Sequence, residues 1–254
     1  MTPLWLKGIA ATTAVIAGFL GYIGYLGGAV FIEIPATARP TPDRAGLAAV
    51  VLSGDMGFNV GMGPRIAKLL TADGIPVIGL NSLTYFRHQR SLPEIKALIA
   101  QAAQRALAFG HARQVILIGQ SFGGDALQVG LAGMPQELRS KVRLVVLIVP
   151  TETIYFRASP SEMFNWTRPD ADALQTAKQL TWVPVLCIYG VEETESLCPS
   201  LRQANVRKLS LPGGHALHWN VDAIHGAISS AIGAAAFAKP GITSASDSVN
   251  IPES

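Results

Sequence analysis

The sequence predicts an α/β domain whose mostly parallel sheet is covered by helices on both faces. From residue 48 onward, apolar runs of strand length alternate with amphipathic runs of helix length, which is the pattern of such a sheet. The chain is also 49% apolar and only 15% charged over its 254 residues. This balance supports one globular core and excludes a mainly disordered chain.

The expected strands are short, continuous apolar runs, because parallel strands are buried on both faces. In chain order they cover residues 48–52, 75–80, 114–118, 142–149, 183–189 and 206–211. Helices are expected between them, each with an apolar stripe at helical spacing. These stripes are Ile66, Leu69 and Leu70; Ile95, Leu98, Ile99 and Leu107, after a Pro93 that opens the helix; and Val221, Ile224, Ile228 and Ile232.

Further helices are expected at about 122–134 and 171–179. The polar and aromatic stretch at 151–170 is too irregular for one element, and we expect a small lid there. Residues 239–254 form a Ser-containing tail that we expect to be disordered. Neither an internal repeat nor a second domain is evident, so residues 48–238 are expected to form one domain.

The N-terminal segment is unusually apolar. Residues 8–32 contain no charge and are bounded by Lys7 and Glu33, a run long enough to cross a bilayer. We therefore expect residues 1–33 to be a signal anchor, or a signal peptide cleaved after Ala36-Thr37-Ala38, followed by a linker at 34–47. The length of the run favours the anchor, since the apolar part of a signal peptide has about 7–15 residues. Either alternative places the rest of the chain outside the cytoplasm.

The charge of the chain bears on its possible partners, and its cysteine content bears on its cellular compartment. The formal net charge is only +3, and no run concentrates basic residues, so a nucleic-acid partner is not expected. The two cysteines, Cys187 and Cys198, are close in sequence and could form a disulfide in an oxidising compartment. The alternative is a pair of reduced, buried thiols.

The sharpest motif is Gly119-Gln120-Ser121-Phe122-Gly123, a GxSxG that follows an expected strand and precedes an expected helix. This is the context of a nucleophile elbow, a tight turn that holds a serine above the carboxyl edge of an α/β-hydrolase sheet. We therefore predict an α/β-hydrolase fold with Ser121 as the nucleophile. The alternative is a Gly-rich turn with an inert serine.

A serine nucleophile needs a base and an acid later in the chain. His215 follows the last expected strand in a Gly-rich loop, and His218 is the second candidate. The loop after the strand at 183–189 offers carboxylates, of which Glu193 lies three residues after Gly190 and is preferred, with Glu192 second. Each of these acids could instead be a solvated loop charge.

Oxyanion donors are expected from the backbone N–H of Phe122 and from Asp55 or Met56 in the loop after the first core strand. The Asp55 side chain would then lie near the reacting atoms, or else stabilise the turn. Motifs for zinc proteases, paired CxxC sites, dinucleotides and P-loops are missing from the sequence, so neither a cofactor nor a metal is expected.

Five spaced motifs resemble the bacterial virulence protein VirJ and AcvB family. They are Ser53-Gly54-Asp55, the segment 81–86, GQSFGGD around Ser121, Cys187 to Gly190 with Glu193 and Cys198-Pro199, and PGGH ending at His215. The resemblance runs from about residue 48 to 236. The sequence departs from the family at Met56-Gly57-Phe58, where GGW is expected, and at Arg87, where Trp is expected.

The resemblance implies an exported α/β-hydrolase that accompanies type IV secretion and removes the aminoacyl group, chiefly lysyl, from aminoacylated phosphatidylglycerol. Ser121 and His215 match the family's nucleophile and base, and the Glu192/Glu193 loop matches its acid region. Asp55 or Asp125 would then hold the substrate ammonium, with Tyr85 also near the substrate. The expected location is the periplasmic face of the inner membrane, or the soluble periplasm after cleavage. The alternatives are a non-catalytic secretion module and a broad-specificity esterase.

Overall fold

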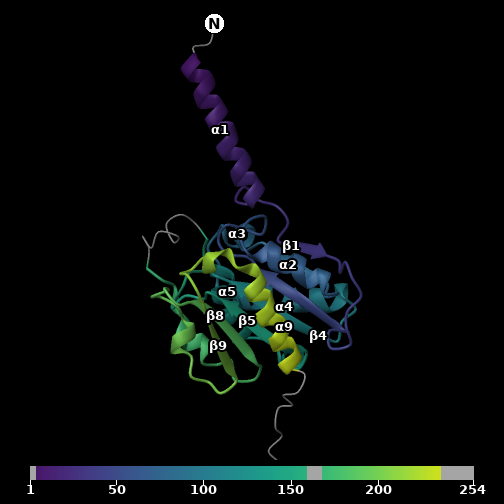
Figure 1. The fold of residues 1–254 in the computed structure, drawn as a ribbon. Helices are drawn as coiled ribbons and strands as arrows, with labels where there is room; N and C mark the ends of the chain where they lie inside the picture. The colour runs from purple at the N-terminus through teal and green to yellow at the C-terminus, as the bar shows by residue number, and fades with distance from the viewer. Residues whose placement is uncertain (1–3, 159–167, 236–254) are drawn as a thin grey trace, which may run out of the picture.

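A computed structural model describes residues 4–158 and 168–235 of the chain. Within these ranges one seven-stranded sheet has the order β1-β3-β2-β4-β5-β8-β9 (Figure 1). All neighbouring strands are parallel except β1, which pairs antiparallel with β3 at the edge. The strands are β1 Phe31–Ile34, β2 Leu47–Leu52, β3 Val77–Leu80, β4 Gln114–Gln120, β5 Val142–Ile148, β8 Val185–Gly190 and β9 Val206–Leu211. The predicted mostly parallel α/β sheet is therefore confirmed.

Helices cover both faces of the sheet, as the alternating pattern predicted. Side chains alternate along β2, so Val50 and Leu52 join one apolar cluster while Ala49 and Val51 join the other. The first cluster lies under α4 Leu92–Phe109, α5 Phe122–Leu131 and α8 Ala173–Ala177, and the second under α2 Gly63–Ala72 and α9 Val221–Ala235. Both sides of every central strand are thus dry, which explains their unbroken apolar sequences.

Several short elements were not evident in the sequence. The helices α3 Ser82–Phe86 and α6 Gln136–Arg139 are each a turn or so long. The strands β6 Thr153–Ile154 and β7 Ala171–Asp172 form a small hairpin within and just beyond the stretch predicted as a lid. Residues 159–167 of that stretch and the predicted tail at 239–254 lie outside the described residues.

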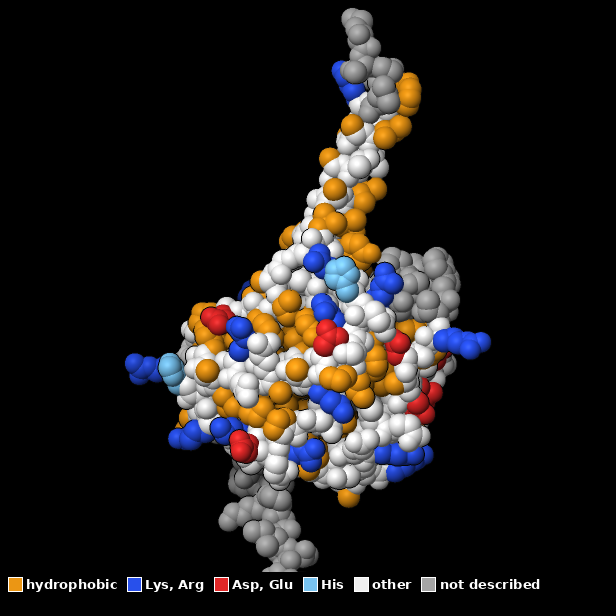
Figure 2. All heavy atoms as spheres, turned by 180° about the vertical axis from the view of Figure 1, so that it is seen from behind, with side chains coloured by type: hydrophobic (Ala, Val, Ile, Leu, Met, Phe, Trp, Pro, Cys, Tyr) orange, Lys and Arg blue, Asp and Glu red, His pale blue; other side chains and the backbone are white. Residues whose placement is uncertain are grey.

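The N-terminal helix α1 Leu4–Ile23 projects from the domain (Figures 1 and 2). Its exposed apolar side chains include Trp5, Ile9, Val15 and Phe19. Among the residues that the structure describes, no helix has both the length and the apolar content needed to cross a membrane. The predicted membrane-spanning helix is therefore not supported.

The uncharged run at 8–32 misled the prediction because only its first part is helical. The chain leaves the helix after Ile23, turns through Gly24 and Gly27 at φ values of 93° and 120°, and enters β1. The uncharged helical part, residues 8–23, is roughly 24 Å long, whereas the hydrocarbon core is about 30 Å thick. Composition alone does not reveal where an apolar run changes from helix to strand.

The two cysteines form a disulfide that links β8 to the loop before β9. The sulfur atoms of Cys187 and Cys198 are 2.06 Å apart, and the sequence separation is 11 residues. The closed loop contains Glu193, so the bridge restrains both ends of the segment that carries this carboxylate. Of the two alternatives for these cysteines, the structure contains the paired one.

Removing the disulfide is expected to destabilise the domain by about 2.5–3 kcal/mol, because an open loop of this length regains its chain entropy in the unfolded state. Denaturant unfolding of a Cys187→Ser/Cys198→Ser double variant against wild type measures the difference. Treating the double variant with a reductant is the control, since reduction should change wild type alone. An equal free energy of unfolding for both proteins would contradict the prediction.

Candidate active site

Ser121 lies on the sharp turn between β4 and α5, at the carboxyl edge of the sheet. Its backbone has φ 53° and ψ −128°, a conformation that a non-glycine residue adopts only under strain. Gly119 and Gly123 on either side have no room for a side chain, since an added Cβ would overlap backbone atoms of α5 and the carbonyl of Ser53 respectively. The GxSxG spacing therefore follows from close packing, and the turn presents the Ser121 side chain above the sheet.

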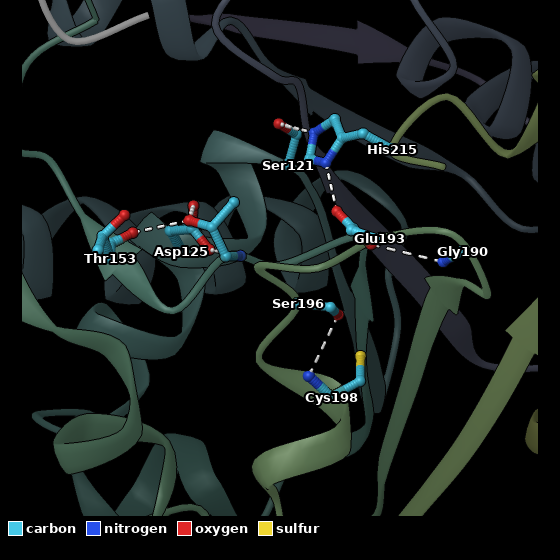
Figure 3. Close-up of polar contacts among 9 residues, drawn as sticks. Ser121, Asp125, Thr153, Gly190, Glu193, Ser196, Cys198 and His215 are labelled. Atoms are coloured by element: carbon cyan, nitrogen blue, oxygen red, sulfur yellow. Dashed lines mark hydrogen bonds and ion pairs between the residues drawn. The ribbon is translucent and has the colours of Figure 1, made fainter. Parts of the chain in front are cut away.

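His215 and Glu193 complete a hydrogen-bond chain with Ser121 (Figure 3). The Ser121 Oγ is 2.8 Å from His215 Nε2, and His215 Nδ1 is 2.5 Å from Glu193 Oε1. A carboxylate can only accept, so the Nδ1 proton faces Glu193 and the Nε2 lone pair is left to accept the proton of Ser121. The arrangement can therefore activate the serine as a nucleophile.

The loop that carries Glu193 is held at several points. The backbone N–H of Gly190 donates to Glu193 Oε2 at 3.4 Å, and the Glu193 N–H donates to the Gly190 carbonyl at 3.1 Å. Further along, Ser196 forms an antiparallel bridge with Thr151 after β5. Together with the disulfide, these bonds fix the carboxylate beside the imidazole, as a supporting shell must do for catalysis.

The charge of Glu193 changes the titration of the histidine. Its hydrogen bond to His215 raises the pKa of the imidazole above the ordinary value of 6.5, and the nearby Asp125 and Asp55 act in the same direction, while partial burial opposes them. The neighbouring Glu192 is exposed and does not take this position. The imidazole of His218, the second candidate base, lies against Gly213.

A cavity of about 270 Å³ opens beside Ser121 and is the space available to a substrate. The predicted residues Asp55, Phe122 and Asp125 line it. Its other walls come from the stretch at 151–170 that was predicted as a lid, and from the loop that carries Glu193. These segments follow β5 and β8 and so lie at the same carboxyl edge as Ser121. These walls are Thr151, Thr153, Tyr155, Arg157, Ala158 and Glu195.

The candidate oxyanion donors lie on both sides of the nucleophile. Phe122 begins α5, and the N–H of a first helical residue has no partner within its helix. Gly54 packs against the Ser121 side chain, and the next residue, Asp55, lines the cavity. Met56, the other predicted donor, is not among the lining residues. The backbone N–H groups of Asp55 and Met56 act to lower the pKa of the Asp55 carboxyl. Burial nevertheless raises the pKa of Asp55 above its ordinary value.

Asp125 lies one turn after Ser121 and is only 5% exposed. Its Oδ1 accepts the N–H of Thr151 at 2.9 Å, and its Oδ2 is 2.9 Å from Thr151 Oγ1. The same hydroxyl is 2.7 Å from the carbonyl of Thr153, which can only accept. One hydroxyl proton cannot serve both acceptors, so a proton on Asp125 completes the chain. Consistent with this, burial raises the pKa of Asp125 from 3.8 to about 7.

Replacing Asp125 by asparagine is expected to stabilise the protein at pH 8 but not at pH 5. The pKa of Asp125 is raised in the folded state, so its contribution to stability is complete below pH 3.8 and is lost as the pH rises through about 7. Asparagine copies the neutral acid: it accepts from the Thr151 N–H and donates to Thr151 Oγ1. Melting temperatures at the two pH values measure the effect.

Asp222→Asn is the matched control because Asp222 is exposed in the first turn of α9, and its effect should be equal at both pH values. A larger loss of stability for Asp125→Asn at pH 8 than at pH 5 would contradict a buried neutral acid.

Tyr85, predicted near the substrate, faces another part of the molecule. Its hydroxyl donates to the carbonyl of Glu94 at 3.2 Å, and the guanidinium of Arg90 lies 4.3 Å from the centre of its ring. The structure therefore brings Ser121, His215, Glu193, Asp55 and Asp125 together and leaves Tyr85 outside this group.

The comparisons with known proteins agree with this geometry. A model of the family described as bacterial virulence protein (VirJ) matches residues 46–235, about three quarters of the sequence. The chain belongs to the VirJ family. A comparison with curated proteins finds no significant match.

Solved structures share the fold of this VirJ-family chain at low sequence identity. Proline iminopeptidase from Mycobacterium smegmatis is 13% identical with a TM-score of 0.57, and covers 81% of this chain and 94% of its own. Est1E from Butyrivibrio proteoclasticus with bound ferulic acid is 12% identical with a TM-score of 0.54, covering 79% and 92%. The Pyrococcus furiosus esterase Pf2001 is 14% identical with a TM-score of 0.52, covering 80% and 88%. The chain thus has the predicted α/β-hydrolase fold.

Proposed function

We propose that this protein is a serine ester hydrolase that cleaves the aminoacyl ester of aminoacylated phosphatidylglycerol. The observation that carries the proposal is the unbroken hydrogen-bond chain from Glu193 through His215 to Ser121, placed beside a cavity at the carboxyl edge of the sheet. Such a chain is the arrangement that enzymes of several unrelated folds use for acyl transfer.

In the first half of the reaction, Ser121 Oγ attacks the ester carbonyl carbon and its proton moves to His215 Nε2. The resulting oxyanion is stabilised by N–H donors, of which Phe122 is the first. The bond between the carbonyl carbon and the glycerol oxygen then breaks, and that oxygen takes the proton from His215. Phosphatidylglycerol leaves, and the aminoacyl group remains as an ester of Ser121.

In the second half, His215 removes a proton from water, and the resulting oxygen attacks the acyl-enzyme carbonyl. The bond to Ser121 Oγ breaks, and the serine recovers its proton from His215. Glu193 stabilises the imidazolium that forms in each half. The products are a free amino acid and phosphatidylglycerol, so atoms and charge balance without a cofactor.

The charge of the cavity favours a cationic acyl group. Its described walls carry the carboxyl groups of Asp55 and Glu195 against the guanidinium of Arg157, while the buried Asp125 holds a proton and adds no charge. Asp125 already binds Thr151 with both oxygens, so Asp55 is the better partner for a substrate ammonium. An ammonium beside Asp55 would also offset the burial that raises the pKa of this carboxyl.

An oxidising compartment fits the disulfide between Cys187 and Cys198. We therefore propose that the protein acts in the periplasm, where an aminoacylated lipid of the membrane surface is within reach. Secretion-system components are further candidate partners on the basis of the family.

The test uses vesicles of phosphatidylglycerol that contain lysyl-phosphatidylglycerol, incubated with wild type or with Ser121→Ala. We expect wild type to release free lysine and Ser121→Ala to release none above background. Labelling with a fluorophosphonate distinguishes the possible failures. Labelling of Ser121 without lysine release would indicate an esterase for another substrate, whereas neither labelling nor release would indicate a non-catalytic module.

Replacing Asp55 by asparagine is expected to lower the preference for a cationic acyl group about 10-fold, which corresponds to roughly 1.4 kcal/mol of lost attraction. The measurement compares kcat/KM for a lysyl ester of glycerol with kcat/KM for the hexanoyl ester, which has the same chain length and no ammonium. Glu192→Asn is the control because this carboxylate is exposed and outside the cavity. Unchanged relative rates in Asp55→Asn would exclude Asp55 as the ammonium partner.

A further inference from the structure

The C-terminal end of α1 enters the domain although the rest of the helix is exposed. Ile23 is 4% exposed and joins the apolar cluster that contains Leu83 and Phe86 of α3. The helix therefore ends inside the folded domain, more than twenty residues before the part of the chain that the VirJ family model matches. There the end of the helix contacts the loop after β2.

This loop, residues 53–59, carries the candidate oxyanion donors and touches α1 directly. The hydroxyl of Tyr22 donates to the carbonyl of Asn59 at 3.2 Å, and the amide of Asn59 donates in return to the carbonyl of Tyr22. Gly57, at φ 79°, lies so close to the carbonyl of Ile23 that an added Cβ would overlap it. The end of α1 and the loop are therefore in van der Waals contact.

Two buried side chains of the segment after β3 bind the same end of the helix. Asn81 Nδ2 donates to the carbonyl of Ile23 at 3.3 Å, and Thr84 Oγ1 donates to the carbonyl of Gly24 at 3.1 Å. The carbonyl of Ile23, the last residue of the helix, has no partner within it, and the bond from Asn81 satisfies it. The carbonyl of Gly24 also accepts the N–H of Gly27 at 3.2 Å, so Thr84 supplies its second hydrogen bond. Asn81 Oδ1 also accepts the N–H of Thr84, which fixes Asn81 in place.

The opposite side of the loop abuts the nucleophile. Gly54 packs on the Ser121 side chain, and Ser53 is tied to Ser82 by two hydrogen bonds of 3.0 and 2.6 Å. The loop is thus held between Ser121 on one side and the α1 end with α3 on the other. Oxyanion donors act only within about 2.7–3.1 Å of the developing charge, so the position of this loop matters for catalysis.

We propose that Asn81 and Thr84, through their bonds to Ile23 and Gly24, form a brace by which the end of α1 positions residues 54–56 against Ser121. The proposal rests on the proposed ester hydrolysis at Ser121 and assigns the N-terminal helix a part in it. Asn81 and Thr84 are positioning residues, since they reach the reacting atoms only through the loop. A displacement of about 1 Å at such a site can cost about 100-fold in rate.

Thr84→Val tests the brace because it keeps the shape and the backbone bond to Asn81 but loses the donor to Gly24. Its matched control is Thr71→Val, which removes an equally buried hydroxyl whose 2.9 Å bond to the carbonyl of Lys68 lies within α2. Thr84→Ser restores the hydroxyl. Asn81→Ala is the stronger variant, and Asn205→Ala is its control, since Asn205 donates to the carbonyls of Leu180 and Val183 before β8.

The readout is phosphonylation of Ser121 by a fluorophosphonate, in which the Oγ–P bond forms and fluoride leaves, because it needs the nucleophile and the oxyanion donors but no particular ester. We expect the maximal labelling rate to fall about 10-fold in Thr84→Val and about 100-fold in Asn81→Ala. The inhibitor concentration for half-maximal rate should stay within about twofold, and Thr84→Ser should recover the rate. Amide hydrogen exchange at residues 54–58 should become faster in the two variants alone.

Other results overturn specific claims. If the brace variants lose no more rate than Thr71→Val and Asn205→Ala, the brace is wrong while the hydrolase stands. If wild type is labelled no faster than Ser121→Ala, the proposed hydrolysis fails and the brace fails with it. If Asn81→Ala does not fold, the comparison of Thr84→Val with Thr84→Ser and Thr71→Val still decides whether the brace exists. If only the lysyl-lipid assay fails, the proposed substrate is wrong, and the labelling experiment still tests the brace.

Discussion

Replacing Ser121 by alanine is expected to lower kcat/KM for ester hydrolysis by at least about 10⁴-fold. The variant lacks the oxygen that forms the acyl-enzyme, so only the oxyanion donors and substrate binding remain to accelerate attack by water. The substitution removes one atom and leaves the Cβ in place, so the strained turn at φ 53° should be unchanged. Release of lysine from lipid vesicles, together with the melting temperature, measures both effects.

Ser196→Ala is the control for this substitution. Ser196 is buried near the same cavity, where its Oγ accepts the N–H of Cys198 at 3.4 Å and does not face His215 (Figure 3). It should retain most of the activity. Turnover by Ser121→Ala within about 10-fold of wild type would mean that the hydrogen bond to His215 does not serve nucleophilic catalysis.

The sequence predicted the sheet because strands that are buried on both faces have continuous apolar sequences. β4 and β5 are read from unbroken apolar runs, and the elbow between β4 and α5 from the glycines that its packing requires. The sequence did not predict β1, whose first two residues, Phe31 and Ile32, are the end of the uncharged run that begins in α1. The pairing of Phe31 with Leu80 depends on the tertiary structure, and no local pattern contains it.

In the candidate site, too, some features follow from local sequence patterns and others depend on long-range contacts. GxSxG and the late His215 locate two members of the hydrogen-bond chain, because their positions follow from the topology of the sheet. The spacing from Gly190 favours Glu193 over Glu192 as the acid, and in the structure it is Glu193 that contacts His215 Nδ1. Burial raises the pKa of Asp125 and makes it a neutral acid. Its bond to Thr151, which lies 26 residues away in the chain, is a long-range contact without a sequence signal.

Replacing Glu193 by glutamine is expected to lower kcat about 10³- to 10⁴-fold while the protein remains folded. Glutamine can present either its oxygen or its amide to His215 Nδ1, so the proton is no longer held there and the Nε2 lone pair is not reserved for Ser121. The negative charge that stabilises the imidazolium is also lost. Kinetics with saturating lysyl ester measure the change.

The pH dependence separates this role from a purely structural one. His215 must be neutral to accept the proton of Ser121, so activity falls as the pH drops below the pKa of this imidazole. The hydrogen bond that His215 donates to Glu193 raises that pKa above 6.5, which places the midpoint of the acidic limb of kcat/KM above pH 6.5 in wild type. Without the carboxylate the imidazolium is less stable, so in Glu193→Gln the midpoint should move to lower pH.

Glu192→Gln makes the same chemical change one residue earlier, on an exposed side chain of the same loop. It should leave both kcat and the midpoint close to wild type, because screening by water weakens its field at the imidazole. A shift of the midpoint in Glu192→Gln that equals the shift in Glu193→Gln would show that the general charge of the loop sets the titration. A shift confined to Glu193→Gln ties the titration to the contact between Oε1 and Nδ1 itself.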